Sequence, residues 1–530
     1  MLSLMIIIVR LHLNNILDQD PRQDNFVLRF QKFSFTVITL KLPDLKSHQI
    51  LEVIKEQNKI GGQGASLFAQ QISQCLNLSQ LNIDFSGNQI KENGLIDLCN
   101  SIGSCLNISS LQLDLSCNKI GDKGISFLTK TIAQCENVDK LDINLKQNNI
   151  SVWGTLLLGD GIAKCKDLTC LKLNFDILEM KSQTNKDFFS CLEASKINEL
   201  SFGFHINSQI SKELMTGLTQ IKSLSHLELN FDQIQDEESK TIAKKIGKLV
   251  NLRFLELSFD YKISVECVAN VFSRLKNCIN LLDLQIFAGC EHISLFKLNN
   301  FLCYLTSLKR LVLSFYDNNS FIGDISHLSK GIACCENLES LEIDMNELSD
   351  EDISLLGEGI GQCSKLSNLK LEITGTTIGI DTFGMQNLGR GLGKCSNLKK
   401  IDINFEHNQI LDQVIFCFLE ELSKAALLEF IKLNLGKNIV CVDNPSSIGQ
   451  GLSLFQNLKT LDININDTDI DNDGAYQLGQ SLMSCQNVTT FRYNISCCQN
   501  LDNEEGLQNF ENQIKKMKRL VNHVHYSFYD

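Results

Sequence analysis

Apolar residues follow two alternating rhythms along most of this chain. Around residue 111 every second position is apolar, with Leu111, Leu113 and Leu115 separated by polar residues. This period of two is typical of a half-buried strand. After a short polar stretch the period changes, because Ile125 and Leu128 begin a stripe at helical spacing. The pattern therefore predicts a strand, a loop and a helix in each stretch of roughly 30 residues.

This unit recurs from residue 51 to the C-terminal region, at intervals of 27 to 32 residues. The first inward strand residue of each copy is Leu51, Leu81, Leu111, Leu141, Leu171, Leu200, Leu227, Leu255, Leu284, Leu311, Leu341, Leu369, Ile401, Ile431, Leu461 or Phe491. A unit of this size buries its apolar face only against its neighbours, so the repeat predicts a solenoid. We expect an α/β fold of about 16 repeats, with parallel strands on a concave face and helices on a convex face. Residues 51–520 form the solenoid, 521–530 a capping strand, and 1–50 an N-terminal cap or uncertain segment.

Two further positions recur within the repeats. An asparagine follows the strand at Asn58, Asn88, Asn118, Asn148, Asn207, Asn318, Asn408 and Asn438. We expect its side chain to turn inward and bond loop backbone groups, which is favoured over a row of ligand-binding amides. A glycine stands six residues later at Gly94, Gly124, Gly154 and, in a late repeat, Gly474. We expect these glycines just before the helix, in a turn conformation that only glycine adopts cheaply.

The pattern Ile83-x-Phe85-x-x-Asn88-x-Ile90-x-x-x-Gly94 and its copies resemble a known family. They are similar to the leucine-rich repeats of ribonuclease inhibitor, of NOD-like receptors and of Ran GTPase-activating proteins. The resemblance covers roughly residues 51–520 and implies a horseshoe-shaped solenoid. Between residues 171 and 311 the asparagine and glycine positions are largely lost, so this middle stretch is either deformed or specialised.

The 21 cysteines follow the repeat instead of a metal or disulfide pattern. Nine stand six residues before the next strand, where other repeats have Ala, Ile, Leu or Phe, so they are expected to pack as small hydrophobes. Adjacent helices lie about 8–10 Å apart, beyond the ~7 Å that bridged Cα atoms allow. We therefore expect free thiols and a cytoplasmic protein. The adjacent pairs Cys334-Cys335 and Cys497-Cys498 are also interpreted as packing.

Charge and motifs narrow the function. The chain has 62 acidic and 49 Lys or Arg residues, a net charge of −13 that disfavours nucleic acid. No apolar run approaches the ~20 residues of a membrane span, so no membrane partner is expected. We find no phosphate loop, kinase signature, nucleophile elbow or zinc motif, and therefore predict no catalytic residue, metal or cofactor. His523 and His525 are interpreted as outward-facing residues of a terminal strand.

The expected inner face is polar and acidic. Two columns of outward strand residues contain ten acids and four bases, a net charge of −6 that suits a basic protein surface or peptide, although a solvated face explains it equally well. Phe287 and Val312 interrupt these columns on neighbouring strands, and Tyr261 and Tyr316 lie in the loops that follow. Trp153 occupies a loop position that is polar in other repeats. These five residues are the predicted partner-binding residues, because hot spots combine apolar and aromatic anchors with a polar surround.

Two functions fit this reading. The first is a non-enzymatic interaction scaffold or receptor subunit that binds a protein on its concave face. The second, implied only by the resemblance to Ran GTPase-activating proteins, is an activator of a small GTPase. Fold similarity alone does not decide between them, because one fold supports many functions.

Overall fold

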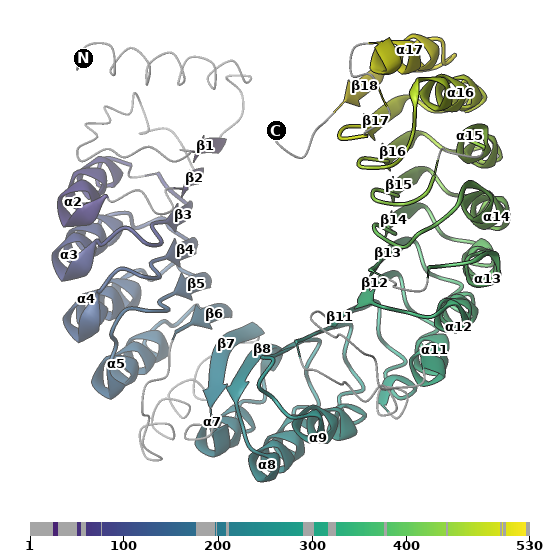
Figure 1. Ribbon diagram of the computed structural model, residues 1–530. Helices are drawn as coiled ribbons and strands as arrows, with labels where there is room; N and C mark the ends of the chain where they lie inside the picture. Colours follow the sequence, from purple (N-terminus) through teal and green to yellow (C-terminus); the bar gives the residue numbers. More distant parts are fainter. Residues whose placement is uncertain are drawn as a thin grey trace, which may run out of the picture. The chain divides into compact units, whose positions relative to one another are not determined.

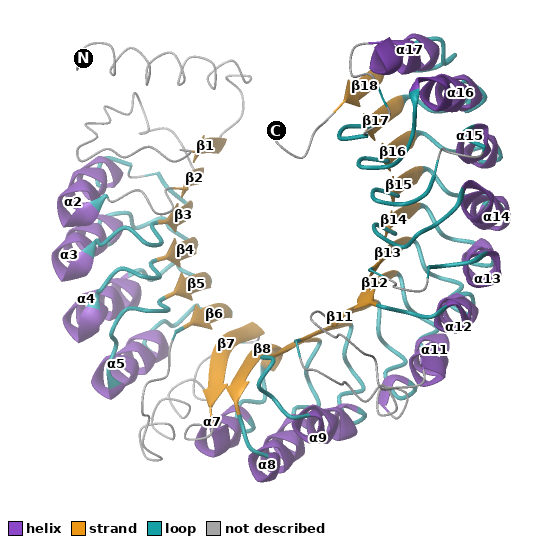
Figure 2. Ribbon diagram, viewed as in Figure 1, coloured by secondary structure: helices purple, strands orange, loops and turns teal. Residues whose placement is uncertain are grey.

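Strands and helices alternate along the chain in the computed structural model (Figure 2). The structure describes residues 25–29, 50–54, 60–75, 77–175, 197, 199–207, 211–289, 301–315, 325–375, 379–440, 444–498, 501 and 505–525. The chain divides into two compact units. The first comprises residues 1–204 and 216–225, and the second comprises 205–215 and 226–530.

The first unit contains four helices and six strands among its described residues. They are β1 (Asn25–Arg29), β2 (Ile50–Ile54), α2 (Gly61–Ile72), β3 (Gln80–Asp84), α3 (Lys91–Ile102), β4 (Ser110–Asp114), α4 (Gly121–Gln134), β5 (Lys140–Asn144), α5 (Val152–Ala163) and β6 (Cys170–Asn174). Three elements are divided between the two units: β7 (Glu199–Asn207), α7 (Ser211–Leu218) and β8 (Leu224–Gln233), of which the first two residues belong to the first unit.

The second unit continues the alternation to the end of the described chain. Its elements after β8 are α8 (Asp236–Ile246), β9 (Phe254–Phe259), α9 (Val265–Leu275), β10 (Asp283–Ala288), β11 (Arg310–Phe315), α11 (Ile325–Ala333), β12 (Ser340–Asn346), α12 (Asp350–Ile360), β13 (Asn368–Thr374), α13 (Thr382–Gly393), β14 (Lys400–Asn404), α14 (Asp412–Leu422), β15 (Phe430–Asn434), α15 (Ser446–Ser453), β16 (Thr460–Asn464), α16 (Asn472–Leu482), β17 (Thr490–Asn494), α17 (Glu505–Ile514) and β18 (Asn522–His525).

Neighbouring strands within each unit are parallel and aligned without stagger. In the first unit Leu81 pairs with Leu111, and in the second Leu255 pairs with Leu284 and Leu284 with Leu311. In each unit the strands lie side by side and the helices pack along the other side (Figure 1). Every strand residue predicted from the repeat lies in a strand. The predicted α/β solenoid of parallel strands and helices is therefore confirmed.

One expectation about the last strand is wrong. His523 pairs with Phe491 and His525 with Tyr493, which are inward positions of β17, so the two histidines occupy inward and not outward positions. Both are nevertheless exposed. His525 stacks on Tyr493 with 5.2 Å between ring centroids.

The core follows the two rhythms of the sequence. In the repeat that begins at Leu111, the strand residues Leu111, Leu113 and Leu115 and the helix residues Ile125 and Leu128 are all at most 1% exposed. Strand residues between them are less buried, as in the β4 pattern of alternating exposed and buried positions. Each repeat thus adds the inward side chains of one strand and the apolar side chains of one helix to the core.

The asparagine positions are structural where the structure describes their side chains. Asn118 is fully buried, and its Oδ1 accepts hydrogen bonds from the N–H groups of Asn88 and Ile90, both at 3.1 Å. Its Nδ2 donates to the carbonyls of Phe85, Leu115 and Ser116 at 2.8–2.9 Å. One amide therefore joins two adjacent loops. The side chains of Asn58, Asn207 and Asn318 lie outside the described residues.

The explanation expected for the glycine positions is wrong. Gly94 lies inside the first turn of α3, and it is not among the residues with positive φ. A Cβ at this position would lie 2.5 Å from Cγ2 of Ile90 and 2.9 Å from Cα of Gly62. Glycine is required because adjacent helices approach closely there, not because of backbone conformation.

Acidic side chains also connect successive helices. Asp350 at the start of α12 accepts hydrogen bonds from the N–H groups of Asp381 and Gly384 at the start of α13, at 3.1 and 2.9 Å. Asp236 of α8 likewise accepts the hydroxyl hydrogen of Ser264, the N-cap of α9, at 2.7 Å. A carboxylate at one helix N-terminus thus neutralises the unpaired donors of the next.

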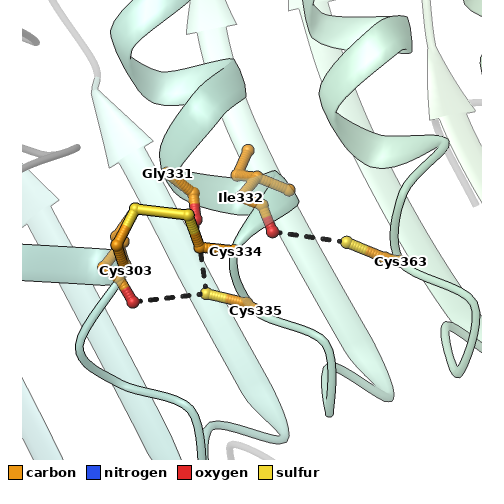
Figure 3. The surroundings of a disulfide bond; sticks show 7 residues. Cys303, Gly331, Ile332, Cys334, Cys335 and Cys363 are labelled. Atoms are coloured by element: carbon orange, nitrogen blue, oxygen red, sulfur yellow. Dashed lines mark hydrogen bonds between the residues drawn. A yellow bond between two sulfur atoms is a disulfide. The ribbon is translucent and has the colours of Figure 1, made fainter.

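The nine helix-end cysteines are buried and free, as expected. Burial raises the pKa of several of these thiols, for example to about 12 at Cys278 and Cys395. Figure 3 shows that both Cys335 and Cys363 point to carbonyls at the end of α11: Cys335 Sγ lies 3.5 Å from the carbonyl oxygen of Gly331, and Cys363 Sγ lies 3.5 Å from that of Ile332. They act as small packing residues with weak donors.

Cys334 corrects the expectation that neighbouring repeats are too far apart to be bridged. It forms a disulfide with Cys303, with the two Cα atoms 4.8 Å apart (Figure 3). Both residues lie in the turns that follow helix ends and not in the helices themselves. The helix-to-helix distance therefore does not apply to them.

Candidate functional site

Most short strands end in a turn made by their second outward residue. Oδ1 of Asp114 accepts the N–H of Ser116 at 2.9 Å, and Oδ1 of Asn434 accepts the N–H of Gly436 at 3.0 Å. The same bond occurs at Asp84, Asn144, Asn404, Asn464 and Asn494. These side chains hold the loop in an Asx turn. The alternation of the sequence had suggested that these side chains form a free polar surface. They do not, because the turns occupy them.

Strands β9 to β13 differ, because they run on for six or seven residues where the Asx-ended strands have five. In β9, β10 and β11 the same column holds Ser258, Phe287 and Ser314, which cannot make an Asx turn. Oγ of Ser314 instead donates to Oδ2 of Asp344 on β12, at 2.8 Å. We call Ser258, Phe287, Ser314 and Asp344 the Phe287 face.

Phe287 lies on the outer side of a regular sheet. It pairs with Ser258 on one side and Ser314 on the other, and Ala288 pairs with Phe259 without a slip in register. Ala288 is fully buried, whereas Phe287 is only half-buried. A bulge that would turn Phe287 into the core is therefore excluded. Its ring stands between two small hydroxyl side chains.

Val312 is not the exposed neighbour that the sequence suggested, since only 3% of it is exposed. It pairs with Gln285 on β10 and Glu342 on β12, two longer side chains that flank it on both sides. Arg310 bridges Asp283 and Glu342 beside them, at 3.3 and 3.8 Å. These longer side chains cover the short side chain of Val312. Val312 therefore supports the face and does not offer an anchor.

Tyr261 and Trp153 lie outside the strands. Tyr261 lies in the loop after β9 and is 61% exposed, with Nζ of Lys262 5.0 Å from its ring centroid. Trp153 is 63% exposed in the first turn of α5, which belongs to the first unit. Tyr316 lies outside the described residues. Phe287 and Val312 are the two that the structure places on adjacent strands, at diagonal positions.

Ion pairs neutralise much of the acidic charge beside the Phe287 face. Lys370 contacts Glu342 and Glu372, both at 2.7 Å. Burial acts to lower the pKa of Lys370, but the hydrogen bonds that its ammonium group donates to these two carboxylates outweigh burial and raise the pKa. Burial also raises the pKa of Asp344, despite the hydrogen bond from Ser314. Asp344 is thus the acidic group of this face that a ligand cation would stabilise.

Sequence reasoning missed Ser314 and Asp344. Their signal was present, because Ser258, Phe287 and Ser314 break a column that otherwise contains mainly Asp and Asn. Only the hydrogen bonds of the other strands show that this column is normally occupied by turn-forming residues.

No group of three potential metal ligands occurs among the residues that the structure describes. In the same part of the chain, no helix has the length and apolar character needed to cross a membrane.

One family model agrees with the repeat architecture over part of the chain. Residues 196–385 match the model of a leucine-rich repeat region, a stretch that includes β9 to β12. The crystal structure of a TLR13–ssRNA13 complex is similar at 14% identity, covering 90% of this chain and 71% of that chain with a TM-score of 0.37. No curated protein matches the sequence.

Proposed function

We propose that this chain, of which residues 196–385 match a leucine-rich repeat region, acts as a non-enzymatic scaffold or receptor subunit that holds a protein partner on the Phe287 face. The observation that carries the proposal is the half-buried phenyl ring of Phe287 on a sheet of regular register. The ring is not fully buried, whereas Ala288 beside it is. A partner that covered the exposed part of the ring would bury apolar surface, which stabilises the complex.

The surround of the ring defines the chemistry of the partner. The hydroxyls of Ser258 and Ser314 leave space on both sides of the ring, so an apolar side chain can pack against it. Asp344 lies two strands from Phe287 in the same row of paired residues, with Ser314 between them, and it is partly buried. A basic residue of the partner would pair with this carboxylate. We therefore propose a peptide or protein surface that presents an apolar side chain next to Lys or Arg.

The proposal is tested with the full chain as bait in extracts of the source cell, followed by binding measurements with each purified candidate. A true partner binds the wild type, and Phe287→Ser weakens it by about 2 kcal/mol or more, roughly 30-fold in Kd. Phe383→Ser is the control, because Phe383 is another phenylalanine of the second unit and is 59% exposed, but it lies on α13. It should leave binding unchanged.

The melting temperature separates a contact from a structural role. Phe287→Ser should melt within a few degrees of the wild type. A loss of roughly 3–5 kcal/mol in stability, as for a core phenylalanine, would contradict the proposal. So would partners that bind Phe287→Ser and the wild type equally. Stimulated GTP hydrolysis by a purified small GTPase would replace the scaffold function with GTPase activation.

We also propose that the protein is cytoplasmic and that neither nucleic acid nor a membrane is its principal partner. The exposed free thiols of Cys117 and Cys497 support a reducing compartment. The Cys303–Cys334 disulfide is the observation against it. Fractionation of the source cell with antibody detection tests the location directly.

A further inference from the structure

A basic hollow lies where α8 and α9 end, on the helix side of the second unit. Its volume is about 400 Å³, and its lining includes Lys244, Lys245, Lys248 and Arg274. Lys244 and Lys245 belong to the last turn of α8, Lys248 follows it, and Arg274 comes from the last turn of α9. Four cations from two repeats therefore surround one space in a chain whose net charge is −13.

These four cations form no ion pair among the described residues, although Lys240 on the same helix pairs with Glu237 at 2.6 Å. The acidic residues of α8 occupy its first turn, at the opposite end of an 11-residue helix. These acidic residues are about 9–14 Å from Lys244 and Lys245 along the helix axis, at 1.5 Å per residue. Among the described residues no carboxylate pairs with these cations, and a bound anion would supply the missing countercharge.

The helix dipole does not account for the cluster. A cation near a helix C-terminus is favourable, but α12, α14 and α16 end without any basic residue in the last turn. The dipole is therefore tolerated without such cations in these repeats. Nor does it explain why Arg274 of the next helix faces the same hollow as the lysines of α8.

Gly247 keeps the hollow open. Its φ and ψ of −63° and −4° are ordinary for any residue, so the backbone does not require glycine. A Cβ at this position would lie 3.0 Å from Nδ2 of Asn277 and 3.3 Å from Cβ of Arg274. Nδ2 of Asn277 donates to the carbonyl of Gly247 at 3.2 Å, which fixes the wall of the hollow. Any larger residue would occupy space that glycine leaves to a ligand.

We propose that this hollow, the α8–α9 pocket, binds a compact anion that carries several phosphate groups. The lysines supply point charges, and the guanidinium of Arg274 supplies a planar pair of donors that matches phosphate oxygens. The volume is in the range of small-molecule sites. The acidic remainder of the chain repels an extended polyanion more strongly than a compact one, so a small polyphosphorylated molecule or headgroup is favoured. This inference is independent of the Phe287 face.

Titration calorimetry with inorganic triphosphate and the full chain, at 0.15 M salt, tests the proposal. We expect saturable binding by the wild type. The double variant Lys245→Gln with Arg274→Gln should raise Kd at least 10-fold. Lys240→Gln, which removes one positive charge from the same helix outside the pocket, should leave Kd within 2-fold. Gly247→Leu should also raise Kd at least 10-fold, although it changes no charge, because its side chain enters the pocket.

The source of the phosphates is distinguished by a second arm. Binding of soluble triphosphate identifies a free ligand. Binding only to phosphatidylcholine vesicles that contain phosphatidylinositol bisphosphate, and not to vesicles of equal charge made with phosphatidylserine, identifies a lipid headgroup, provided that Gly247→Leu abolishes it. Two results would overturn the proposal: no binding in either arm, or equal weakening by Lys240→Gln and the double variant, which indicates diffuse charge attraction.

Discussion

Replacement of Asn118 by leucine is the sharpest test of how the repeats are held together. The side chain is fully buried and bonds five backbone groups from two successive loops. Leucine has a similar volume but no polar atoms. The substitution therefore removes the bonds without opening a large cavity, and its cost is mainly that of unpaired backbone groups.

The magnitude follows from the groups that lose their partner. The N–H groups of Asn88 and Ile90 lose the Oδ1 acceptor in a buried loop. The carbonyl of Ser116 keeps a second partner, the N–H of Gly87 at 2.9 Å. Counting the two N–H groups alone at roughly 1–3 kcal/mol each gives a loss of about 2–6 kcal/mol. Because a repeat array unfolds in parts, the loss should be concentrated around residues 80–125.

Hydrogen exchange measured by mass spectrometry, together with urea denaturation, resolves this local effect. Asn118→Leu should accelerate exchange in peptides that contain Asn88 and Ile90 and lower the first unfolding midpoint. Asn118→Thr should be milder, because Thr468 occupies the same slot of a later repeat and its Oγ1 donates to the carbonyl of Ile465. The control Asn137→Leu removes one exposed bond, from Nδ2 to the carbonyl of Leu106, and should cost under about 1 kcal/mol. If Asn118→Leu is no more damaging than this control, the structural role of the asparagines is refuted.

Three further outcomes are expected. Peptide-level alkylation of the native protein should label exposed Cys117 well before the nine helix-end cysteines, because burial raises the pKa of those thiols; equal labelling rates would contradict their burial. Serine at Cys303 and Cys334 should lower the stability of the oxidised protein by up to about 3–4 kcal/mol, as for a loop of about 30 residues, and should have little effect under reducing conditions. Burial, followed by the hydrogen bond and charge of Asp381, raises the pKa of Asp350 from 3.8 to about 6. The stability from this group is therefore complete below about pH 4 and is lost as the pH rises through 6; a melting temperature with the same pH 5 to 7 dependence in Asp381→Ser would refute the pairing.

The parts of the fold that the sequence predicted are those that every repeat must satisfy. Apolar alternation placed Leu111 and its counterparts in aligned strands, because a slip of one residue would expose the entire inward set. The burial of the helix-end cysteines could be predicted for the same reason, since other repeats place hydrophobes there. Periodicity is informative when one physical requirement recurs at the same position.

The expectations that failed depended on pairs of residues that no period describes. The burial of Val312 depends on the long side chains of Gln285 and Glu342 on the adjacent strands. The Cys303–Cys334 bond depends on how closely two turns approach, which the distance between helix axes does not give. The side chains of neighbouring repeats have to be placed before such contacts can be derived.

The same distinction explains why the Phe287 face is found in the middle of the chain. Where Asp or Asn ends a strand, its side chain is occupied by the turn, and a substitution there removes a loop bond as well as changing the surface. In β9 to β11 the strand continues past this position, so Ser258, Phe287 and Ser314 carry no turn and can vary without that cost. Where the strand loses its Asx-turn residue, the side chain at that position also becomes available to form a contact surface. A search for contact residues in such repeats should therefore begin where the Asx turn is missing, before net charge or exposed aromatic residues are considered.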